Sequence, residues 1–470
     1  MGDIGLLDAT AQAELVRTRQ IDPTELIEAA IERIELLNPA INAVVTPMYD
    51  RARMDGATHS LRGPFGGVPF LLKDLIARYA GSPLTEGSAF LRDYVPDHDS
   101  ELVTRIKQAG LVIVGKTNTP EFGILGTTEP RLFGPTRNPW DPSRSAGGSS
   151  GGAAAAVASG MVAMAHASDA AGSIRIPASC CGVFGFKPSE GRVSVDPARA
   201  DTAAGLWTEH VITRSVRDSA AMLDAITGSV FEATPRTGSI RIAFSAKAPT
   251  GVPVHLDCID AVRDAAHLCE RLGHVVEEDA PPLSQEILTD AFDVVWTVCV
   301  AAAVEGWIRI IGRRPDGDEL EPLTWALLEL GSRRSGPDYL RALGQLQTLA
   351  REVARFHRGF DVWLTPTLAH PPPGLGWFDF SPDEPLRGYV RDSEFCAFTP
   401  LANFTGQPSM SVPLSWNREG LPIGVQFTAR VGEDDLLLSL GAQLEEAREW
   451  AQRPPHVPGA APDSSSQDGE

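Results

Sequence analysis

The chain has 470 residues and a formal net charge of −20, because 61 Asp and Glu residues outnumber 41 Lys and Arg residues. Nucleic-acid binding requires basic side chains that neutralise phosphates, so this composition argues against nucleic acid as a partner, and the same repulsion works against anionic membrane surfaces. The longest uncharged apolar run, Ala153 to Ala165, is shorter than the roughly 20 residues that a membrane-spanning helix needs. We therefore predict a protein that binds neither nucleic acid nor membrane.

The N-terminal residues contain neither the basic stretch nor the apolar core of a secretory signal. The cysteines form no Cys-x-x-Cys pair and show no metal-ligand spacing with histidine. We therefore predict a cytoplasmic protein with reduced, mostly buried thiols and with no metal or other cofactor. The six cysteines are Cys180, Cys181, Cys258, Cys269, Cys299 and Cys396.

The N-terminal part of the chain carries clear helix signals. Residues 22–25 (Asp-Pro-Thr-Glu) place a capping residue, a first-turn proline and a capping-box glutamate in order, and Asn38–Pro39 marks the expected end of this helix. A second helix is predicted over residues 101–108, capped by Ser100, and it leads into an apolar strand over residues 111–114.

Strand-like and helix-like segments then alternate, which predicts an α/β sheet with helices packed on its faces. We expect one domain over residues 1–453, with a helical insertion at about 255–360, and a disordered tail over 454–470, where Pro, Ser, Asp and Gly dominate. The further predicted elements are helices over 258–272, 289–311, 339–360 and 434–450, and strands over 362–364 and 424–427.

Two familiar sequence patterns fail once their context is considered. Residues 110–117 match the phosphate-binding P-loop, but the four middle residues (Leu-Val-Ile-Val) favour a buried strand. Residues 147–151 match Gly-x-Ser-x-Gly, the nucleophile elbow of α/β-hydrolases, but the residues before Ser149 are loop-like where that motif needs a strand. We interpret the first match as accidental and keep the second, with Ser149 as the nucleophile, as an alternative.

A third arrangement requires no histidine. Lys73 lies at the end of the apolar run over residues 66–74, and a lysine among apolar side chains can be neutral near pH 7 and accept a proton from a hydroxyl group. Candidate hydroxyl groups lie in two turns of small residues, at Ser149 and at Ser173. From the residues alone, a surface lysine and two flexible loops remain the simpler interpretation.

Longer stretches of the chain resemble the amidase signature family. The likeness is strongest in residues 147–152 (GGSSGG), 169–177 (DAAGSIRIP) and 181–188 (CGVFGFKP). Further motifs follow the order of the family over nearly the whole chain, and the DAAGS variant is most similar to the branch that contains 6-aminohexanoate cyclic dimer hydrolase. These motifs are GGVPFLLKD (66–74), GKTNTPEFG (115–123), RNPWD (137–141), TPT (365–367) and segments within 405–426.

The resemblance implies an α/β amidase-signature fold, with a central, twisted, mixed β-sheet covered by helices on both faces. It also implies an amidase that forms an acyl-enzyme through a Ser–cis-Ser–Lys triad. By position, Ser173 would be the nucleophile, Ser149 the bridging serine on a cis peptide bond, and Lys73 the base. The substrate would be a small carboxylic amide, linear or cyclic, and the protein a monomer or homodimer without a cofactor. The oxyanion hole would consist of the backbone amides of Ala170, Ala171, Gly172 and Ser173.

Supporting roles follow from the same resemblance. Ser150 is expected to orient Lys73 by a hydrogen bond, whereas Asp169 and Arg175 are expected to form a structural pair beneath the loop. Ala171 stands where the family usually has glycine, and its methyl group would restrict the backbone conformations of the loop or reduce the volume of the pocket. We expect the helical insertion to wall that pocket, with a lining that includes Trp296, Cys299 and Phe398.

Two further functions remain open from the sequence. One is a glutaminase-type subunit of a tRNA-dependent amidotransferase, which would depend strictly on partner chains and on glutamine. The other is a non-catalytic binding protein on the amidase fold. The second function would be favoured if Lys73 were exposed or distant from Ser149.

Overall fold

The computed structural model describes residues 4–58, 62–193, 204–231, 234–235, 238–380, 383–453, 455 and 457. Its centre is an 11-stranded sheet in the order β1-β3-β2-β4-β6-β5-β10-β11-β9-β7-β8. The strands are β1 Val44–Pro47, β2 Pro69–Lys73, β3 Val112–Thr117, β4 Met164–Asp169, β5 Phe184–Lys187, β6 Thr208–Thr213, β7 Arg241–Phe244, β8 Val275–Glu278, β9 Val362–Pro366, β10 Ser409–Trp416 and β11 Pro422–Ala429.

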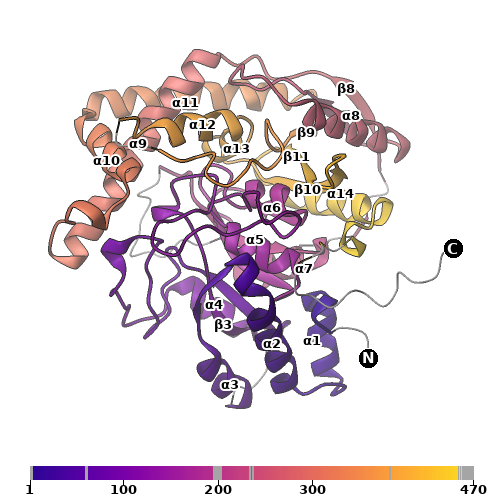
Figure 1. The fold of residues 1–470 in the computed structure, drawn as a ribbon. Helices are drawn as coiled ribbons and strands as arrows, with labels where there is room; N and C mark the ends of the chain where they lie inside the picture. The colour runs from indigo at the N-terminus through magenta and orange to yellow at the C-terminus, as the bar shows by residue number, and fades with distance from the viewer. Residues whose placement is uncertain are drawn as a thin grey trace.

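Parallel pairing is confined to β2 with its neighbours β3 and β4, and to β7 with its neighbours β8 and β9, so the sheet is mixed as predicted. Helices surround it (Figure 1). They are α1 Ala9–Arg17, α2 Pro23–Ile41, α3 Tyr49–Thr58, α4 Glu101–Gln108, α5 Gly151–Ala158, α6 Arg175–Cys181, α7 Val216–Thr227, α8 Leu256–Arg271, α9 Gln285–Ile311, α10 Pro322–Arg333, α11 Gly336–Phe356, α12 Arg387–Phe395, α13 Pro400–Phe404 and α14 Asp434–Ala447.

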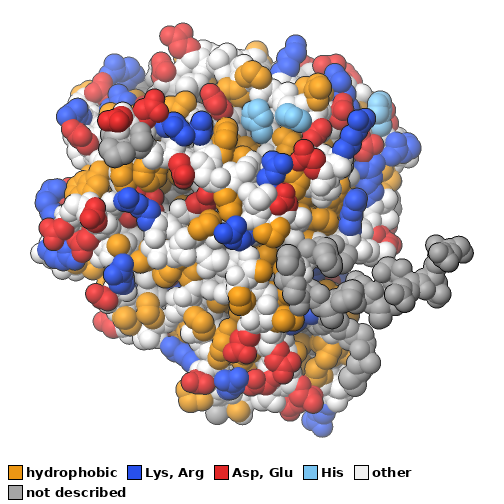
Figure 2. Space-filling model, viewed as in Figure 1, with side chains coloured by type: hydrophobic (Ala, Val, Ile, Leu, Met, Phe, Trp, Pro, Cys, Tyr) orange, Lys and Arg blue, Asp and Glu red, His pale blue; other side chains and the backbone are white. Residues whose placement is uncertain are grey.

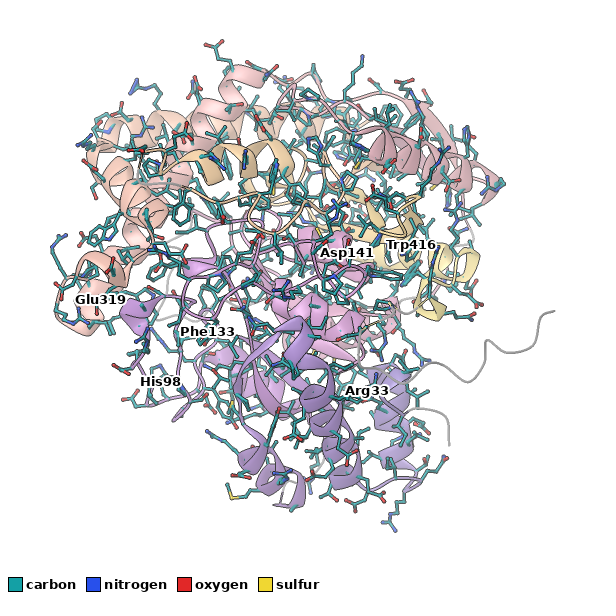
Figure 3. The ribbon with its side chains drawn as sticks, viewed as in Figure 1. Arg33, His98, Phe133, Asp141, Glu319 and Trp416 are labelled. Carbon is teal, nitrogen blue, oxygen red and sulfur yellow. The ribbon has the colours of Figure 1, made fainter. Side chains whose placement is uncertain are left out.

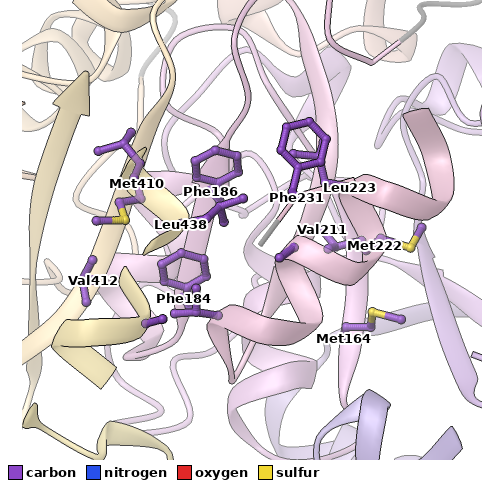
Figure 4. Close-up of a cluster of buried hydrophobic side chains, with 14 of the residues drawn as sticks. Met164, Phe184, Phe186, Val211, Met222, Leu223, Phe231, Met410, Val412 and Leu438 are labelled. Atoms are coloured by element: carbon purple, nitrogen blue, oxygen red, sulfur yellow. The ribbon is translucent and has the colours of Figure 1, made fainter. Parts of the chain in front are cut away.

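One face of the sheet packs against α4, α7, α8 and α14. In this core, Phe184 and Phe186 of β5 lie beside Met410 of β10, and Leu223 of α7 and Leu438 of α14 cover them (Figure 4). All five side chains are almost completely buried. Burial of large apolar side chains of this kind is the main favourable contribution to folding, so this core stabilises the centre of the sheet.

The other face is covered by α2 and α5. Leu71 of β2 points to this face while Phe70 and Leu72 pack in the first core, as the alternation of side chains along a strand requires. Helix α5 lies very close to the sheet, because a Cβ atom on Gly152 would be 2.5 Å from the backbone nitrogen of Asn118. Small residues in α5 therefore allow the close approach that places its N-terminus beside β2.

Helix α2 begins as predicted but ends later. The capping box of residues 22–25 is present, whereas the helix continues through Pro39 to Ile41. Proline lacks an amide hydrogen and its ring crowds the carbonyl four residues before it, but at Pro39 both effects fall within the last turn and do not end the helix. The Asn38 side chain accepts hydrogen bonds from the two backbone amides that follow Asn42. On its outer side, Arg33 of α2 donates to the carbonyl of Gly160 at 2.6 Å (Figure 3).

The P-loop match lies in the buried strand β3, so the interpretation of this match as accidental is confirmed. The predicted helix over 101–108 and its Ser100 cap are also confirmed. The predicted disordered tail lies outside the described residues except at Pro455 and Val457, and Val457 is buried in the same cluster as α5.

The segment expected to be a helical insertion has two parts. Helix α8 packs on β9, β10 and β11 and is followed by the edge strand β8, so this part completes the sheet. Helix α9 packs against both α10 and α11, and the three helices lie together at the upper left in Figure 1. Helix α10 has no counterpart among the sequence predictions.

Helix α9 is the one helix among the described residues that is long and apolar enough to cross a membrane, by length and composition only. It packs along α10 and α11, which covers part of its apolar surface. On the molecular face shown in Figure 2, acidic and basic side chains are interspersed.

Candidate active site

Lys73 lies at the end of β2 and is completely buried. Its Nζ atom donates to Ser149 Oγ at 2.7 Å, to Ser150 Oγ at 2.9 Å and to Ser168 Oγ at 3.0 Å. The structure thus brings together Lys73, Ser149 and Ser150 as the sequence predicted. Ser168 was not predicted, because only the pairing of β4 in the sheet brings it to the lysine.

Burial lowers the pKa of Lys73 to about 7, and the carboxylates of Glu209, Asp169 and Glu86 act in the opposite direction. A lysine in this state carries a substantial neutral fraction at physiological pH and can accept a proton.

A pair of side chains next to Lys73, His166 and Glu209, was not predicted from the sequence. His166 Nδ1 accepts a hydrogen bond from the Lys73 backbone amide at 3.3 Å, and His166 Nε2 lies 2.7 Å from Glu209 Oε2. Trp207 Nε1 donates to the other oxygen of Glu209 at 2.7 Å. These contacts hold a carboxylate near the lysine, and no local motif in the sequence signals them.

The turn that carries Ser149 contains a cis peptide bond between Gly148 and Ser149. Glycine is required at position 148, because a Cβ atom there would lie 2.3 Å from the carbonyl oxygen of Thr127. The residues before Ser149 form no strand, so the structural context of a nucleophile elbow is absent. Ser150 N donates to Ser173 O at 3.3 Å and joins the two serine turns.

Ser173 precedes α6 and lines a cavity. The loop before it differs from the prediction in one respect: the Gly172 amide donates to Asp169 Oδ1 at 2.7 Å, so it is not available to an oxyanion. The amides of Ala170, Ala171 and Ser173 donate to no group among the described residues. Of the four predicted donors, only these three amides therefore stay available as candidates.

The Ala171 methyl group lies at the wall of the same cavity, so its effect is on the shape of the pocket. The backbone at Ala171 is not among the positive-φ positions, and it is therefore compatible with alanine. Thr399 Oγ1 donates to the Ala171 carbonyl at 2.7 Å, which anchors this part of the loop to the segment before α13.

Arg175 and Asp169 form a buried ion pair under this loop. Arg175 Nε donates to Asp169 Oδ2 at 3.0 Å, and the remaining guanidinium hydrogens reach Asn403, Gln426 and the Thr399 carbonyl. Burial alone would raise the pKa of Asp169, but the charge and hydrogen bonds of Arg175 lower it to about 2. The pair ties the loop to α13 and β11 and is not part of the described lining of the two cavities beside this loop, which fits a structural role.

Two adjoining cavities open beside the serines, with volumes of about 270 and 310 Å³. Both are lined by Gly123, Ile124 and Trp296. The first cavity includes Ala170, and its other lining residues include Leu75, Phe122, Leu206, Cys299 and Val300. The second includes Ala171 and Ser173, and its other lining residues include Leu125, Phe292, Val390 and Asp392.

The predictions for the pocket lining were right for two residues and wrong for the third. Trp296 lines both cavities and Cys299 lines the first, each from α9. Phe398 lines neither, because it is buried in a separate apolar cluster with Ala248, Ala369 and Ala397. Among the described residues, no three His, Cys, Asp or Glu side chains are grouped to hold a metal ion.

Comparison with known proteins agrees with this arrangement. The Amidase family profile matches residues 25–438. The chain is 39% identical over 477 aligned positions to 6-aminohexanoate-cyclic-dimer hydrolase of Paenarthrobacter ureafaciens, with 96% of each chain covered.

Comparison with solved structures also indicates the amidase signature family. The structure of a 6-aminohexanoate cyclic dimer hydrolase complexed with substrate is similar, with a TM-score of 0.92 and 37% identity over 96% of this chain and 99% of that one. A bacterial aryl acylamidase of the amidase signature family is similar with a TM-score of 0.84 and 30% identity over 97% and 99% of the two chains. The chain therefore belongs to the amidase signature family and is a hydrolase of carbon–nitrogen bonds in amides.

Proposed function

We propose that this protein hydrolyses a carboxylic amide, linear or cyclic, through an acyl-enzyme on Ser173. The observation that carries the proposal is the buried Lys73, whose Nζ atom lies 2.7 Å from Ser149 Oγ in the turn that adjoins Ser173. Burial disfavours the charged form of this lysine, and its hydrogen bond to a serine hydroxyl, which the equally buried Lys187 lacks among the described residues, favours catalysis over binding alone.

In the proposed reaction, neutral Lys73 accepts a proton from Ser149 while Ser149 accepts one from Ser173. The Ser173 oxygen attacks the amide carbonyl, and the negative charge develops on the carbonyl oxygen. The amides of Ala170, Ala171 and Ser173 stabilise that charge, and removal of one such donor costs roughly 3–4 kcal/mol in comparable enzymes. The relay then returns the proton to the leaving nitrogen, and water hydrolyses the acyl-enzyme by the same route.

The two cavities support a substrate with apolar chains, although carboxylates also line them: Glu86 and Glu190 in the first, and Asp290, Asp293 and Asp392 in the second. Trp296, Phe122 and Phe292 contribute aromatic surface, and no Lys or Arg side chain belongs to the described lining of either cavity. A pocket of this kind suits alkyl chains on one or both sides of the amide. The similarity to enzymes named for a cyclic dimer of 6-aminohexanoate supports medium-length chains, in linear or ring form.

Labelling with a serine-reactive fluorophosphonate and mapping of the modified peptide test the proposal. We expect the label on Ser173 in the wild type and its loss in Lys73→Ala, because the nucleophile then lacks its base. Lys187→Ala is the matched control, since Lys187 is equally buried and burial also lowers its pKa to about 7, but its Nζ atom bonds only the Pro188 carbonyl among the described residues. A label on Ser149, or one that persists in Lys73→Ala, would show that the proposed mechanism is wrong.

The pH dependence of the reaction gives a second test. Only neutral Lys73 accepts a proton, so we expect kcat/KM to rise about tenfold per pH unit in the acidic range and to level off near the lysine pKa of about 7. Glu209→Gln removes a carboxylate that raises this pKa, so the acidic limb should move to lower pH. A profile that stays in place or moves to higher pH would contradict the assignment of Lys73 as the base. Glu419→Gln, at an exposed surface pair with Arg144, should leave the profile unchanged.

A further inference from the structure

The charged side chains that line the second cavity are all acidic. Three carboxylates line it, Asp290, Asp293 and Asp392, and no lysine or arginine is among its described lining residues. Asp293 already has a cationic partner, because Arg334 donates to its Oδ2 atom at 2.8 Å. Asp290 is exposed at the rim. Asp392 is the carboxylate inside the cavity that shares its wall with Ser173.

The surroundings of Asp392 leave its charge uncompensated. Its Oδ1 atom accepts a hydrogen bond from the Gly126 amide at 2.6 Å, and the Cys396 thiol lies 3.6 Å from the same atom. Burial raises the pKa of Asp392 to about 7, and these two neutral donors only partly offset that effect. The side chain is nevertheless only partly covered, so part of its surface is open to the cavity.

Gly126 is required for this arrangement. A Cβ atom at position 126 would lie 2.7 Å from Asp392 Oδ1 and 2.7 Å from Cys396 Sγ. The glycine therefore lets the segment after the Gly123–Ile124 wall approach α12 closely and holds the carboxylate by a backbone amide. A carboxylate kept in a reaction cavity by a backbone contact, without a cationic partner in the lining, is suited to a cationic ligand.

We propose that Asp392 is a specificity-determining residue that binds a protonated amino group of the substrate, so that the substrate class is amides carrying an amino group at the end of an alkyl chain. The inference rests on the proposed amide hydrolysis at Ser173. An ammonium group at Asp392 restores the balance of charge in the second cavity, and the apolar walls contributed by Leu125, Phe292 and Val390 suit the alkyl chain.

Binding of an ammonium group at Asp392 would also affect the hydrolysis of cyclic amides. Acylation breaks the ring C–N bond and forms a C–O bond to Ser173, and the nitrogen leaves as an amine that stays tethered to the acyl group. The relay supplies one proton to that nitrogen, and solvent supplies a second to form the ammonium ion. Held at Asp392, the ammonium ion cannot attack the ester carbonyl and close the ring again, so hydrolysis is favoured over ring closure.

Matched pairs of amides test the proposal in the full-length protein. 6-Aminohexanamide is compared with heptanamide, which carries a methyl group in place of the ammonium group, and N-(5-aminopentyl)acetamide is compared with N-hexylacetamide. The two pairs place the charge on the acyl side and on the amine side of the amide. We expect the wild type to prefer the ammonium member of at least one pair by about tenfold or more in kcat/KM. No preference in either pair would overturn the proposal.

Asp392→Asn keeps an oxygen for the Gly126 amide and removes the charge, so we expect this preference to fall by about tenfold. Glu394→Gln is the control, because it removes the same charge from an exposed side chain of α12 and should leave the preference unchanged. Binding of hexylammonium, measured by calorimetry with the wild type and both variants, is independent of turnover. Binding that depends on Asp392 without hydrolysis of any amide would disprove the proposed function alone, whereas hydrolysis with binding indifferent to Asp392 would disprove this inference alone.

Discussion

Ser173→Ala is expected to lower kcat for amide hydrolysis by roughly 10⁴- to 10⁶-fold, because in the proposed mechanism the change removes the nucleophile and leaves only binding and oxyanion stabilisation. The variant should fold normally, since the Ser173 hydroxyl makes no hydrogen bond within the described part of the chain and its backbone carbonyl still accepts from Ser150. Steady-state hydrolysis of a neutral alkyl amide, with melting temperature as a check of folding, measures the effect.

The control is Ser411→Ala, a buried serine that contacts Thr367 and lines neither cavity. It should keep kcat within about tenfold of the wild type. Combination of Ser173→Ala with Lys73→Ala should cost little beyond either change alone, because residues that act as a unit are not additive. Additive losses, or substantial activity of Ser173→Ala, would show that Ser173 is not the nucleophile.

Arg175→Met is expected to lower the free energy of unfolding by about 3–5 kcal/mol, the range for breaking a buried, hydrogen-bonded ion pair by removal of one partner. The substitution leaves Asp169 buried with its charge uncompensated and removes hydrogen bonds to Asn403 and Gln426. Arg175 lowers the pKa of Asp169 to about 2. In the wild type, the ionised Asp169 carboxylate therefore contributes to stability at pH values above the ordinary pKa of aspartate. This contribution is lost as the pH falls toward about 2.

Urea denaturation of Arg175→Met at neutral and acidic pH measures this effect. The control is Arg241→Met, which breaks an ion pair with Glu277 whose side chains are 52% and 50% exposed. Exposed pairs contribute about 0–1 kcal/mol, so the control should change stability little. If Arg175→Met lost no more stability than the control, the ion pair would not be the contact that stabilises the loop over residues 169–173.

Several features of this protein follow from residues that are close together in the sequence. The caps of α2 and α4 could be predicted from residues 22–25 and Ser100, because a cap is a hydrogen bond between neighbours. The rejection of the P-loop match followed from four apolar residues in succession, which favour a strand. The members of the candidate triad came from the family resemblance of ordered motifs, since composition alone gave Lys73 no distinction from a surface lysine.

The other features of the site depend on contacts between segments that are far apart in the sequence. Phe398 is buried away from the cavities, and the Gly172 amide turns to Asp169, because packing and loop geometry set these directions. Gly126 and Asp392 are 266 positions apart, and no local pattern relates them. The sequence by itself determined the helix caps, which are short-range hydrogen bonds, and its ordered motifs determined the family and, through the family, the mixed α/β class. Only the tertiary structure decided which amides, carboxylates and aromatic side chains face the cavities, because burial and pKa depend on neighbours that the folded chain brings together.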